Sequence, residues 1–476
     1  MSPTSGPPIP AGPGVAPGPG VAVAVAVAGE RGDKAGWSLA DWLAWQETLH
    51  VREIDLGLER SRQILDRLAL PPPGRVIVTV AGTNGKGSSV AMLDAIYRAA
   101  GYRTGCYTSP HLLRYNERIR IDGVPAADEE IVAAFRQVEA ARGQISLTYF
   151  EFGTLAAFCL LAAAQPDVAI LEVGLGGRLD AVNLLDADLA LLTTIDLDHT
   201  QWLGDTREQI GREKAGILRP DRPAVCSDPA PPASILECAA RLGTPLSRLG
   251  QGYGFMVSAA GFDFWGSAGR FSSLPCPGLF GDYQYQNATG VLETVGLLQG
   301  RLPVTEAAVR QGLAGAFVAG RFQRFPGPVE VVLDVAHNPQ GAVALTHCLR
   351  KVPAAGGTHF VVGMMRDKDI GKFLGECASL AASFWVAGLP VTRGAPPGQL
   401  AELLTDLKVT VPIHPHEQVA EAFASALRAA VPGDRVVVTG SFLTVAEGLR
   451  CLEAAGRGAA GAVGAGGMGM GMGGMP

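Results

Sequence analysis

The chain has 476 residues, 47% of them hydrophobic, and a formal net charge of −6 at pH 7. This length exceeds what one compact core normally holds, so we expect two domains with terminal tails. The acidic balance argues against nucleic acid and against an anionic membrane surface as the main partner. The eight cysteines form no C-x-x-C pair, which favours unpaired, mostly buried thiols in a reducing cytosol.

No segment has the features of an export signal or a membrane span. Residues 21–28 alternate Val and Ala, but no Lys or Arg precedes them, so a charged n-region is missing. The apolar run at residues 155–164 is too short to cross a bilayer. We therefore predict a cytoplasmic protein that does not bind membranes.

Both ends of the chain are of low complexity. Residues 1–35 are rich in Pro, Gly and Ala, and residues 454–476 are rich in Gly, Ala and Met. Such segments bury too little apolar surface to fold, so we predict two disordered tails. The alternating methionines could suggest a soft-metal site, but without His or Cys a disordered tail is the better interpretation.

The most informative stretch is the glycine-rich segment at residues 81–89, Ala-Gly-Thr-Asn-Gly-Lys-Gly-Ser-Ser. A β-branched run at 76–80 precedes it, and apolar residues at helical spacing follow it up to a stop at Gly101. Glycines let backbone N–H groups approach an anion, the helix N-terminus adds positive potential, and Lys86 adds a charge. The order strand, glycine-rich turn, helix therefore predicts nucleotide phosphate binding rather than a structural turn.

One feature departs from the usual P-loop, in which Ser or Thr follows the lysine and binds Mg²⁺. Here Gly87 follows Lys86, so Ser88 or a residue elsewhere must supply the hydroxyl group. This departure points away from ordinary kinases and GTPases.

Polar residues follow several predicted strands of the first domain. Residues 38–70 read as two helices, and predicted strands at 104–107, 168–171 and 189–195 each end in polar or glycine-rich sequence. Ligands of open α/β sheets bind beyond the carboxyl ends of the strands. We therefore expect the site at this edge of a parallel sheet.

A Pro-Gly-Pro segment at 326–328 predicts a linker to a second, smaller domain. Beyond it, strands are expected at 329–335, 359–364, 383–387 and 435–439, alternating with helices such as one opening at 337–339 and one near 416–430. This alternation is typical of a Rossmann-like fold. The segment lacks Gly-x-Gly-x-x-Gly, so dinucleotide binding is not implied.

Taken one by one, the polar candidates allow more than one interpretation. We interpret Glu172 as a Mg²⁺ ligand rather than as a helix cap or surface carboxylate, because glycines follow it directly. His199 fits a metal or phosphate role about as well as a structural one. Lys214 on its predicted helix reads as a solvated residue by spacing alone. Ser109 is only a candidate for the missing hydroxyl, and Asp334 and His337 could face the nucleotide of the first domain.

Together, these segments resemble one enzyme family over about residues 38–453. They look like bacterial folylpolyglutamate synthase/dihydrofolate synthase, a Mur-ligase-type enzyme. The segments that carry the resemblance are residues 82–88, 108–112, 146–151, 172–180, 197–200, 212–217, 275–287 (loosely), 320–323, 334–339, 363–369 and 440–442. Motifs of this length in this order are specific, and the tails lie outside them.

The resemblance implies an α/β fold in which a P-loop Mur-ligase-like ATPase domain, residues 36–325, is followed by a smaller Rossmann-like α/β domain, residues 326–453. It also implies a reaction. ATP phosphorylates a carboxylate, and the amino group of L-glutamate attacks the acyl phosphate. The acceptors would be dihydropteroate, which gives dihydrofolate, and reduced folates, which give folylpolyglutamates.

The resemblance further assigns roles to individual residues. ATP would be bound by Asn84, Gly85, Lys86, Gly87, Ser88, Asn287, Arg321 and Asp334. One Mg²⁺ would be held by Ser109 and Glu172, and a second by His199 and Lys214, the latter as an N-carboxylysine formed with CO₂. The glutamate would lie near His337 and Ser441, and the catalytic group would be Lys86, Lys214 and His337. The pterin or folate would contact Leu56, Gly57, Leu58, Thr148, Tyr149, Phe150, Glu151 and Asp180, with Phe150 as the stacking face.

The implied chemistry is physically coherent. A lysine carbamate turns a cation that would repel Mg²⁺ into an oxygen ligand, and its formation needs a neutral amine, which burial or nearby cations favour. An acyl phosphate hydrolyses in water, so we expect the smaller domain to close over the site by motion about residues 320–328.

Several alternatives remain at this point. The enzyme could be a monofunctional folylpolyglutamate synthase or dihydrofolate synthase. A cell-wall Mur ligase would need a UDP-sugar-binding domain before Gly82, and the sequence leaves no room for one. A P-loop regulatory ATPase would bind a partner protein through its second domain. A catalytically dead scaffold is disfavoured because every demanding position is intact. With the whole site in one chain, we expect a monomer.

Overall fold

The computed structural model of the protein describes residues 34–259 and 261–457, so the two predicted disordered tails fall largely outside the described residues. The described residues from Ser38 onward form one compact unit. Before it, η1 (Lys34–Gly36) is a single 3-10 turn, and the Lys34 ammonium lies 5.3 Å from the centre of the Trp37 ring.

The first part of this unit, here called the first lobe, is built on an eight-stranded sheet in the order β4-β3-β2-β5-β1-β6-β7-β8. The strands are β1 (Val76–Ala81), β2 (Thr104–Tyr107), β3 (Ile119–Ile121), β4 (Val124–Pro125), β5 (Val168–Glu172), β6 (Leu189–Leu192), β7 (Ala224–Cys226) and β8 (Leu246–Arg248). All are parallel except β3 and β4, which form an antiparallel edge. Every residue of β1 is buried, as expected for a strand with helices on both faces.

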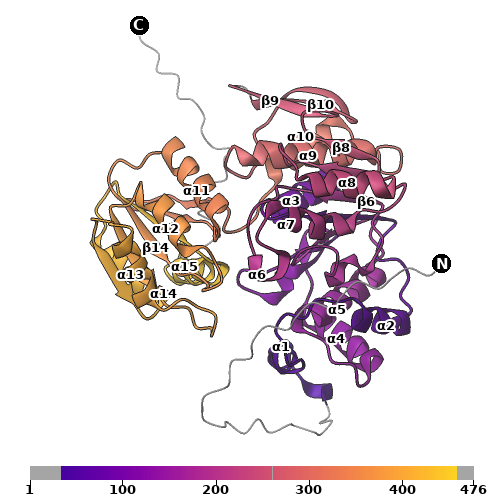
Figure 1. Ribbon diagram of the computed structural model, residues 1–476, viewed down its shortest axis with the longest axis horizontal. Coiled ribbons are helices and arrows are strands. Elements are labelled where there is room, and N and C mark those ends of the chain that lie inside the picture. Colours follow the sequence, from indigo (N-terminus) through magenta and orange to yellow (C-terminus); the bar gives the residue numbers. More distant parts are fainter. Residues whose placement is uncertain (1–33, 260, 458–476) are drawn as a thin grey trace, which may run out of the picture. The chain divides into compact units, whose positions relative to one another are not determined.

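Helices cover this sheet on both faces (Figure 1). They are α1 (Leu39–Thr48), α2 (Glu59–Leu68), α3 (Lys86–Ala99), α4 (Asp128–Arg142), α5 (Tyr149–Ala164), α6 (Thr200–Leu203), α7 (Arg207–Lys214), α8 (Ala233–Leu242), α9 (Tyr283–Leu297) and α10 (Glu306–Gly315), with 3-10 turns η2 (Tyr115–Arg118), η3 (Ala181–Leu184) and η4 (Ala215–Ile217). The two predicted helices within residues 38–70 are confirmed as α1 and α2. Helix α1 begins with a capping box between Ser38 and Asp41.

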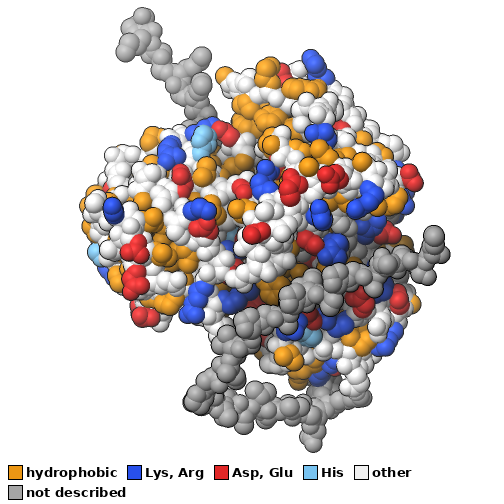
Figure 2. All heavy atoms as spheres, in the orientation of Figure 1, with side chains coloured by type: hydrophobic (Ala, Val, Ile, Leu, Met, Phe, Trp, Pro, Cys, Tyr) orange, Lys and Arg blue, Asp and Glu red, His pale blue; other side chains and the backbone are white. Residues whose placement is uncertain are grey.

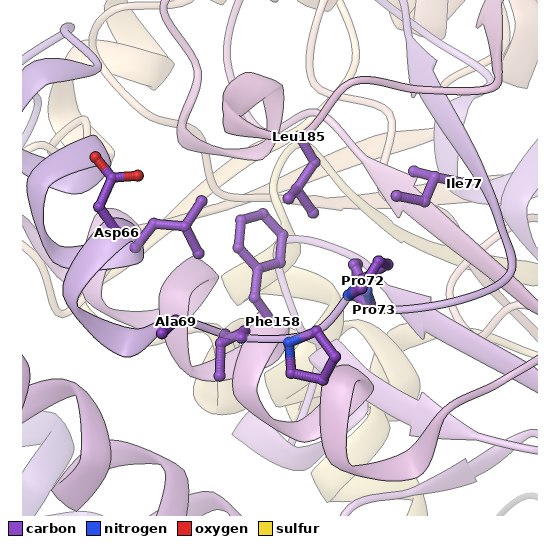
Figure 3. A pocket seen from close by; sticks show the side chains of 10 residues that line it. Asp66, Ala69, Pro72, Pro73, Ile77, Phe158 and Leu185 are labelled. Atoms are coloured by element: carbon purple, nitrogen blue, oxygen red, sulfur yellow. The ribbon is translucent and has the colours of Figure 1, made fainter.

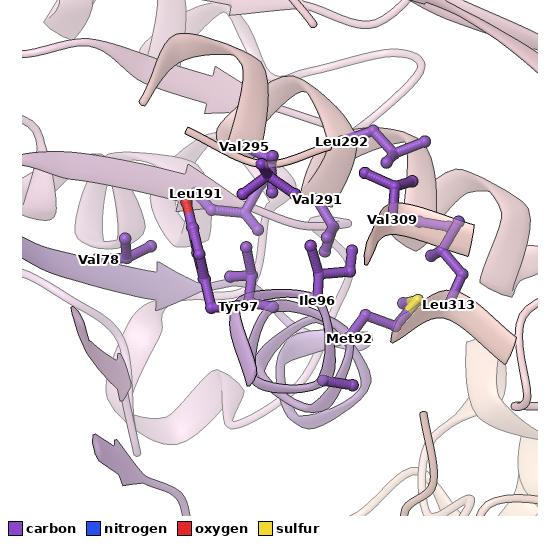
Figure 4. Close-up of a cluster of buried hydrophobic side chains, with 14 of the residues drawn as sticks. Val78, Met92, Ile96, Tyr97, Leu191, Val291, Leu292, Val295, Val309 and Leu313 are labelled. Atoms are coloured by element: carbon purple, nitrogen blue, oxygen red, sulfur yellow. The ribbon is translucent and has the colours of Figure 1, made fainter. Parts of the chain in front are cut away.

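The main core of the first lobe lies between the sheet and the helix pair α9 and α10, with α3 in the middle (Figure 4). Ile96 and Tyr97 of α3 are fully buried there, beside Leu191 of β6 and Val295 of α9. A side chain at Gly312 of α10 would overlap the backbone of Ile96, so a glycine is required where the two helices approach most closely. This packing fixes the helix that follows the phosphate loop.

A three-stranded antiparallel sheet, not predicted from the sequence, lies beside α9. Its strands are β9 (Gly254–Ser258), β10 (Gly261–Gly266) and β11 (Gly269–Leu274), in the order β11-β10-β9. Phe262 of β10 packs edge-on against Tyr285 of α9, with 5.4 Å between ring centres. A glycine at the start of each strand and the polar residues within the strands hide their pattern in the sequence.

The second lobe contains a six-stranded sheet in the order β12-β13-β17-β14-β15-β16. Its strands are β12 (Gln323–Phe325), β13 (Glu330–Leu333), β14 (Thr358–Val362), β15 (Ser383–Ala387), β16 (Ile413–His416) and β17 (Arg435–Thr439), and its helices are α11 (Pro339–Lys351), α12 (Ile370–Ala378), α13 (Pro397–Asp406), α14 (Val419–Ala429) and α15 (Phe442–Ala454). The four strands predicted for this part are confirmed, with shorter bounds at 330–333 and 358–362. The α/β alternation is confirmed as well.

Residues 326–328 lie between two strands of this second sheet. Strand β12 pairs antiparallel with β13, so the Pro-Gly-Pro segment connects neighbouring strands of a hairpin. The chain enters this hairpin through Gly320 and Phe322, which have φ angles of 70° and 43°. The domain bounds and the motion about residues 320–328 stay predictions.

The thiols follow the expectation from the sequence. All eight cysteines are unpaired, and six of them are buried, whereas Cys276 is exposed and Cys451 is partly exposed. On the face seen in Figure 2, Lys and Arg side chains are interspersed with Asp and Glu. Among the described residues, none of the helices is long and apolar enough to span a bilayer.

Candidate active site

The glycine-rich segment forms a tight turn between β1 and α3, as predicted. Gly85 has a φ of 91° and directly precedes Lys86, the first residue of α3. A Cβ atom on Gly82 would overlap the Thr193 hydroxyl, and one on Gly85 would overlap the Asn287 amide. These positions therefore require glycine, because the loop lies against β6 and α9 with no room for a side chain.

The end of β6 supports this loop from the other side. The predicted strand 189–195 is shorter than expected, because after Leu192 the chain bonds to the loop. The hydroxyls of Thr193 and Thr194 donate to the carbonyl of Asn84 at 2.7 and 3.1 Å. The loop backbone is thus held in place without contribution from the second lobe.

Two lysine ammonium groups converge on one carbonyl oxygen of the loop. The Nζ atom of Lys86 donates to Gly82 O at 3.0 Å, and that of Lys214 donates to the same oxygen at 2.9 Å. Burial lowers the pKa of both groups, and the charge of Lys86 further lowers the pKa of Lys214, to about 7. Lys214 is the last residue of α7 and only 5% exposed, so the reading of a solvated helix face is wrong.

Glu172 and Ser109 lie next to each other because their strands are neighbours. Glu172 ends β5, which pairs with β2 on one side and β1 on the other, and Ser109 follows β2. The backbone N–H of Ser109 donates to the Glu172 carboxylate at 3.3 Å. Burial raises the pKa of Glu172, although Lys86 and Arg321 act in the opposite direction.

His199 follows β6 and precedes α6, with a φ of 52°. Burial lowers the pKa of this imidazole to about 4, so the ring is neutral near pH 7. A neutral imidazole keeps a free lone pair, which a metal ligand needs.

The neighbouring Asp198 receives three side chains of the second lobe. Lys368 Nζ lies 2.6 Å from its carboxylate, Asn338 Nδ2 donates to it at 3.1 Å, and His337 Nε2 lies 3.3 Å away. Burial alone would raise the pKa of Asp198, but the His337 hydrogen bond and the nearby cations hold it well below its usual range. Asp198 is therefore an anion at the contact between the two lobes.

The predicted ATP residues of the second lobe come together near the end of β13. Both oxygens of Asp334 accept backbone N–H groups, from Phe322 and Ala336, each at 2.8 Å. Burial raises the pKa of Asp334, opposed by the charge of Arg321. The Arg321 guanidinium lies 5.3 Å from the centre of the Phe442 ring.

His337 and Ser441 lie at the starts of the two helices that follow β13 and β17. The Nδ1–H of His337 donates to the carbonyl of Val335 at 2.8 Å, which turns Nε2 toward Asp198. Ser441 caps α15, since its hydroxyl accepts the backbone N–H of Thr444 at 3.1 Å. Parallel pairing of β13 with β17 explains why residues a hundred positions apart meet at this edge.

Asn287 and Ser88 are linked through one residue of α9. Asn287 donates to Gln284 at 3.0 Å, and Gln284 donates to the Ser88 hydroxyl at 3.3 Å. Asn287 is 3% exposed and adjoins the phosphate loop at Gly85. Helix α9 thus holds the first turn of α3.

Two of the predicted pterin segments are joined by an arginine. Arg60 donates to Glu151 at 3.0 Å and to Asp55 at 2.6 Å, which ties the start of α5 to the loop holding Leu56, Gly57 and Leu58. The three loop residues are partly exposed.

The start of α5 is itself closely bonded. Thr148 and Glu151 form a capping box, so this glutamate is used structurally. Tyr149, the first residue of α5, is partly exposed, and the Arg118 guanidinium lies 5.5 Å from the centre of its ring.

Phe150 lies in the first turn of α5, and Asp180 caps the 3-10 turn η3. The ring of Phe150 covers Gly174, where any Cβ atom would overlap it, and its centre is 6.3 Å from that of Tyr107. Asp180 accepts the backbone N–H groups of Leu175 and Val182 at 2.8 and 2.9 Å. Burial raises the pKa of Asp180 to about 6.

Some residues of this site had no predicted role. Lys368, Asn338 and Gln340 belong to or adjoin the segments that carry the family resemblance, yet only the structure brings them to the first lobe. The one signal in the sequence was their place just after predicted strands. Within the described ranges, no cluster of three or more His, Cys, Asp or Glu side chains is arranged to hold a metal, so the metal ligands stay a prediction.

A cavity of about 510 Å³ lies elsewhere in the first lobe (Figure 3). Phe158, Leu185 and three consecutive prolines line it, with Asp66 as the charged group on its wall. Ile77, near the amino end of β1, also borders it, so the cavity is at the opposite end of the strand from the phosphate loop. It contains none of the predicted site residues.

Comparison with known proteins identifies the family. Residues 320–442 match the family model described as Mur ligase, glutamate ligase domain. The dihydrofolate synthase/folylpolyglutamate synthase of Escherichia coli (strain K12) is 43% identical over 425 residues, covering 89% of this chain and 98% of the relative.

Solved structures agree over nearly the same span. A structure of E. coli FolC in complex with DHPP and ADP superposes with a TM-score of 0.83 at 42% identity, covering 88% of this chain and 99% of that one. A bifunctional folylpolyglutamate synthase/dihydrofolate synthase with Mn, AMPPNP and L-glutamate bound has a TM-score of 0.81 at 45% identity, with the same coverage. This chain therefore belongs to the dihydrofolate synthase/folylpolyglutamate synthase family, whose members are ATP-dependent ligases that add glutamate to folates.

Proposed function

We propose that this chain joins L-glutamate to dihydropteroate and to reduced folates, using ATP to form an acyl phosphate on the acceptor carboxylate. The observation that carries the proposal is the convergence of Lys86 and Lys214 on Gly82 O. Both lysines lie at the carboxyl end of the parallel strands, where Glu172 also lies. The related structures with bound DHPP, ADP, AMPPNP and L-glutamate support these substrates.

The phosphate groups of ATP lie in this proposal against the loop at residues 84–88, with Asn287, Arg321 and Asp334 as further contacts. Transfer of a phosphoryl group to a carboxylate brings two anions together, so positive groups must offset their repulsion. Lys86 does so from the loop, and Arg321 does so from the start of the second lobe. The close spacing of Arg321 and Phe442 supports a guanidinium held in one orientation.

The donor set fits divalent cations. The backbone of Ser109, which carries a hydroxyl group, lies against the Glu172 carboxylate, and His199 offers a neutral ring nitrogen. We assign Ser109 and Glu172 to one Mg²⁺ and His199 to a second, consistent with the manganese in a related structure. The ions would neutralise phosphate charge during transfer.

Lys214 is proposed to carry a carbamate. Its pKa of about 7 leaves a large neutral fraction of the amine at physiological pH, and only the neutral amine attacks CO₂. The amine lone pair forms the new C–N bond while one C=O π bond of CO₂ opens onto oxygen, and one proton leaves to solvent, so the neutral amine becomes an anionic carbamate. An anionic oxygen group on Lys214 would suit the second metal that we assign to His199.

The second lobe is proposed to bring the amino acid to the acyl phosphate. His337 and Ser441 lie at helix starts on the edge facing the first lobe, where a carboxylate is favoured by the helix dipole. The pterin is proposed to contact only first-lobe residues, with Phe150 as its stacking face and Asp180 and the loop at 56–58 around it. A monomer suffices for this arrangement, because one chain supplies every named residue.

The test is ADP release with MgATP and L-glutamate, with dihydropteroate, with tetrahydrofolate, or without an acceptor. We expect release with both acceptors and its loss in Lys86→Ala and Glu172→Ala. Release with only one acceptor would make the enzyme monofunctional, as either dihydrofolate synthase or folylpolyglutamate synthase. Release that depends on neither acceptor nor glutamate would contradict the ligase and favour a regulatory ATPase.

A further inference from the structure

Asn338, the residue before helix α11, uses every hydrogen-bonding position of its side-chain amide. Its Oδ1 accepts the backbone N–H of Gly341 at 2.8 Å and the Nδ2–H of Asn84 at 3.2 Å. Its Nδ2 donates to Asn84 Oδ1 at 3.2 Å and to Asp198 Oδ2 at 3.1 Å. An amide has two donor and two acceptor positions, so these four bonds exhaust it.

Two of the partners belong to different loops of the first lobe. Asn84 lies in the phosphate loop, and Asp198 lies in the loop after β6 that carries His199. Lys368 bonds to the same Asp198, and Gln340 accepts a further hydrogen bond from Asn84 at 2.6 Å. We call these five residues, Asn84, Asp198, Asn338, Gln340 and Lys368, the interlobe junction.

The centre of the junction is buried, whereas Asn84 and Gln340 are partly exposed. Asn338 is 2% exposed, and the side chains of Asp198 and Lys368 are each 7% exposed. The backbone of Asn84 is held by two threonine hydroxyls, and Asn338 is fixed as the cap of α11. A buried amide with all four positions bonded specifies one arrangement, and its loss leaves its buried partners with unpaired groups.

We propose that Asn338 is a positioning residue that holds the second lobe in register with the phosphate loop by joining Asn84 to Asp198. The inference rests on the proposed function, which places ATP at the loop and glutamate beside His337, the residue before Asn338. Asn338 then contacts no reacting atom itself. It fixes the distance between the ATP at the phosphate loop and the glutamate beside His337, which must meet in the reaction.

A second contact between the lobes provides the control. Asp282, which precedes α9, pairs with His347 at 2.9 Å and with Lys351, both on α11. The side chains of Asp282 and His347 are half exposed, and exposed ion pairs contribute little to stability. The substitution Asp282→Asn therefore weakens an interlobe contact without touching the junction.

The informative variant is Asn338→Asp. It keeps an oxygen for the Gly341 N–H and the start of α11, but it removes both donors and places a second carboxylate beside Asp198. The double variant Asp198→Asn/Asn338→Asp exchanges donor and acceptor, and so restores an amide–carboxylate bond at the same place. A variant that only disturbs folding would not be rescued in this way.

The first measurement is amide hydrogen exchange of the phosphate loop in the protein without substrates. We expect Asn338→Asp to speed exchange at residues 82–88 by about threefold or more, the double variant to reverse most of that change, and Asp282→Asn to leave it unaltered. Equal exchange in Asn338→Asp and wild type, or no reversal in the double variant, would overturn the proposal. Should Asn338→Asp not fold, Asn84→Ala removes both bonds between Asn84 and Asn338 from the other side, and faster exchange at the start of α11 is the expected result.

The second measurement is a comparison of Michaelis constants. Asn338→Asp should raise KM for ATP and for L-glutamate together, by about tenfold, because both bind at the junction, and leave KM for dihydropteroate within about twofold. An increase confined to dihydropteroate contradicts the assignment. If the wild type releases no ADP with these substrates, the proposed function fails, whereas the exchange experiment still decides the role of Asn338.

Discussion

The carboxyl ends of the two sheets carry buried polar residues of different kinds. In the first lobe, Lys86, Glu172 and Lys214 are charged groups with few bonds to the protein, and burial shifts the pKa of each toward its neutral form. In the second lobe, Asp334 and Ser441 are satisfied by backbone N–H groups. The first edge is therefore prepared for a charged ligand, and the second is a rigid frame that presents groups to it.

The largest loss of activity should come from a substitution at the carboxyl end of the first sheet. Lys86→Ala removes the cation nearest the phosphate loop, and we expect glutamate-dependent ADP release to fall by at least about 100-fold, as for loss of a charge-stabilising donor. Lys372→Ala removes an exposed lysine of α12 that pairs with Asp369 and serves as the matched control. Comparable losses in both variants would mean that general charge, rather than the loop, sustains the activity.

The buried Lys214 should lower the stability of the folded protein at neutral pH. Because the folded pKa is about 7 and the ordinary value is 10.5, the unfolded chain binds more protons between these limits, so this group makes stability rise with pH in that window. We expect Lys214→Met to unfold at a higher temperature than wild type at pH 7 in CO₂-free buffer, and the gap to narrow toward pH 10. A gap that does not change with pH would mean that Lys214 keeps its ordinary pKa.

Replacing the two buried carboxylates, Asp334 and Glu172, by amides should change the stability of the protein in opposite directions. Asp334→Asn places an NH₂ group against one of two backbone N–H donors, and we expect it to destabilise the protein by about 1–3 kcal/mol. Glu172→Gln removes a charge that burial disfavours, and we expect an equal or higher melting temperature with lower activity. Denaturant unfolding of both variants checks this, and a loss of stability in Glu172→Gln would remove the distinction between the edges.

The smallest effect on stability is expected from a substitution at the carboxyl end of the second sheet. Ser441→Ala removes the cap of α15 and should reduce the free energy of unfolding by about 1 kcal/mol. Thr305→Ala removes an equivalent cap from α10, far from the site, and should have a similar effect on stability. If Ser441 also contacts glutamate, as proposed, then only Ser441→Ala raises KM for L-glutamate.

The parts of this structure that the sequence predicts are those with an uninterrupted physical signal. Strands β1 and β5 are mostly apolar runs bounded by glycine or polar residues, and the loop after β1 has an unmistakable order of glycines and lysine. Strand β16 was missed because it contains two histidines and a proline, and β9 to β11 because each begins with a glycine and contains polar residues. The sequence did not indicate that Lys214 is buried either, because the phosphate loop, whose Gly82 carbonyl Lys214 contacts, lies far away in the sequence.

The contacts between lobes were beyond prediction for a related reason. Asp198 and Lys368 are 170 positions apart, and neither has a periodic pattern that would indicate its partner. Their meeting depends on the position of one folded lobe on another, which local propensity does not encode. Motif order located both segments, but not their bond.

The distribution of thiols gives this enzyme a natural pair of labelling sites. Cys276, just before α9, is exposed, Cys451 on α15 is partly exposed, and the other six are buried. A thiol-reactive dye should therefore attach to one position on each lobe of the unmodified chain. Energy transfer between two such dyes would report the separation of the lobes during turnover, without introducing a single new residue.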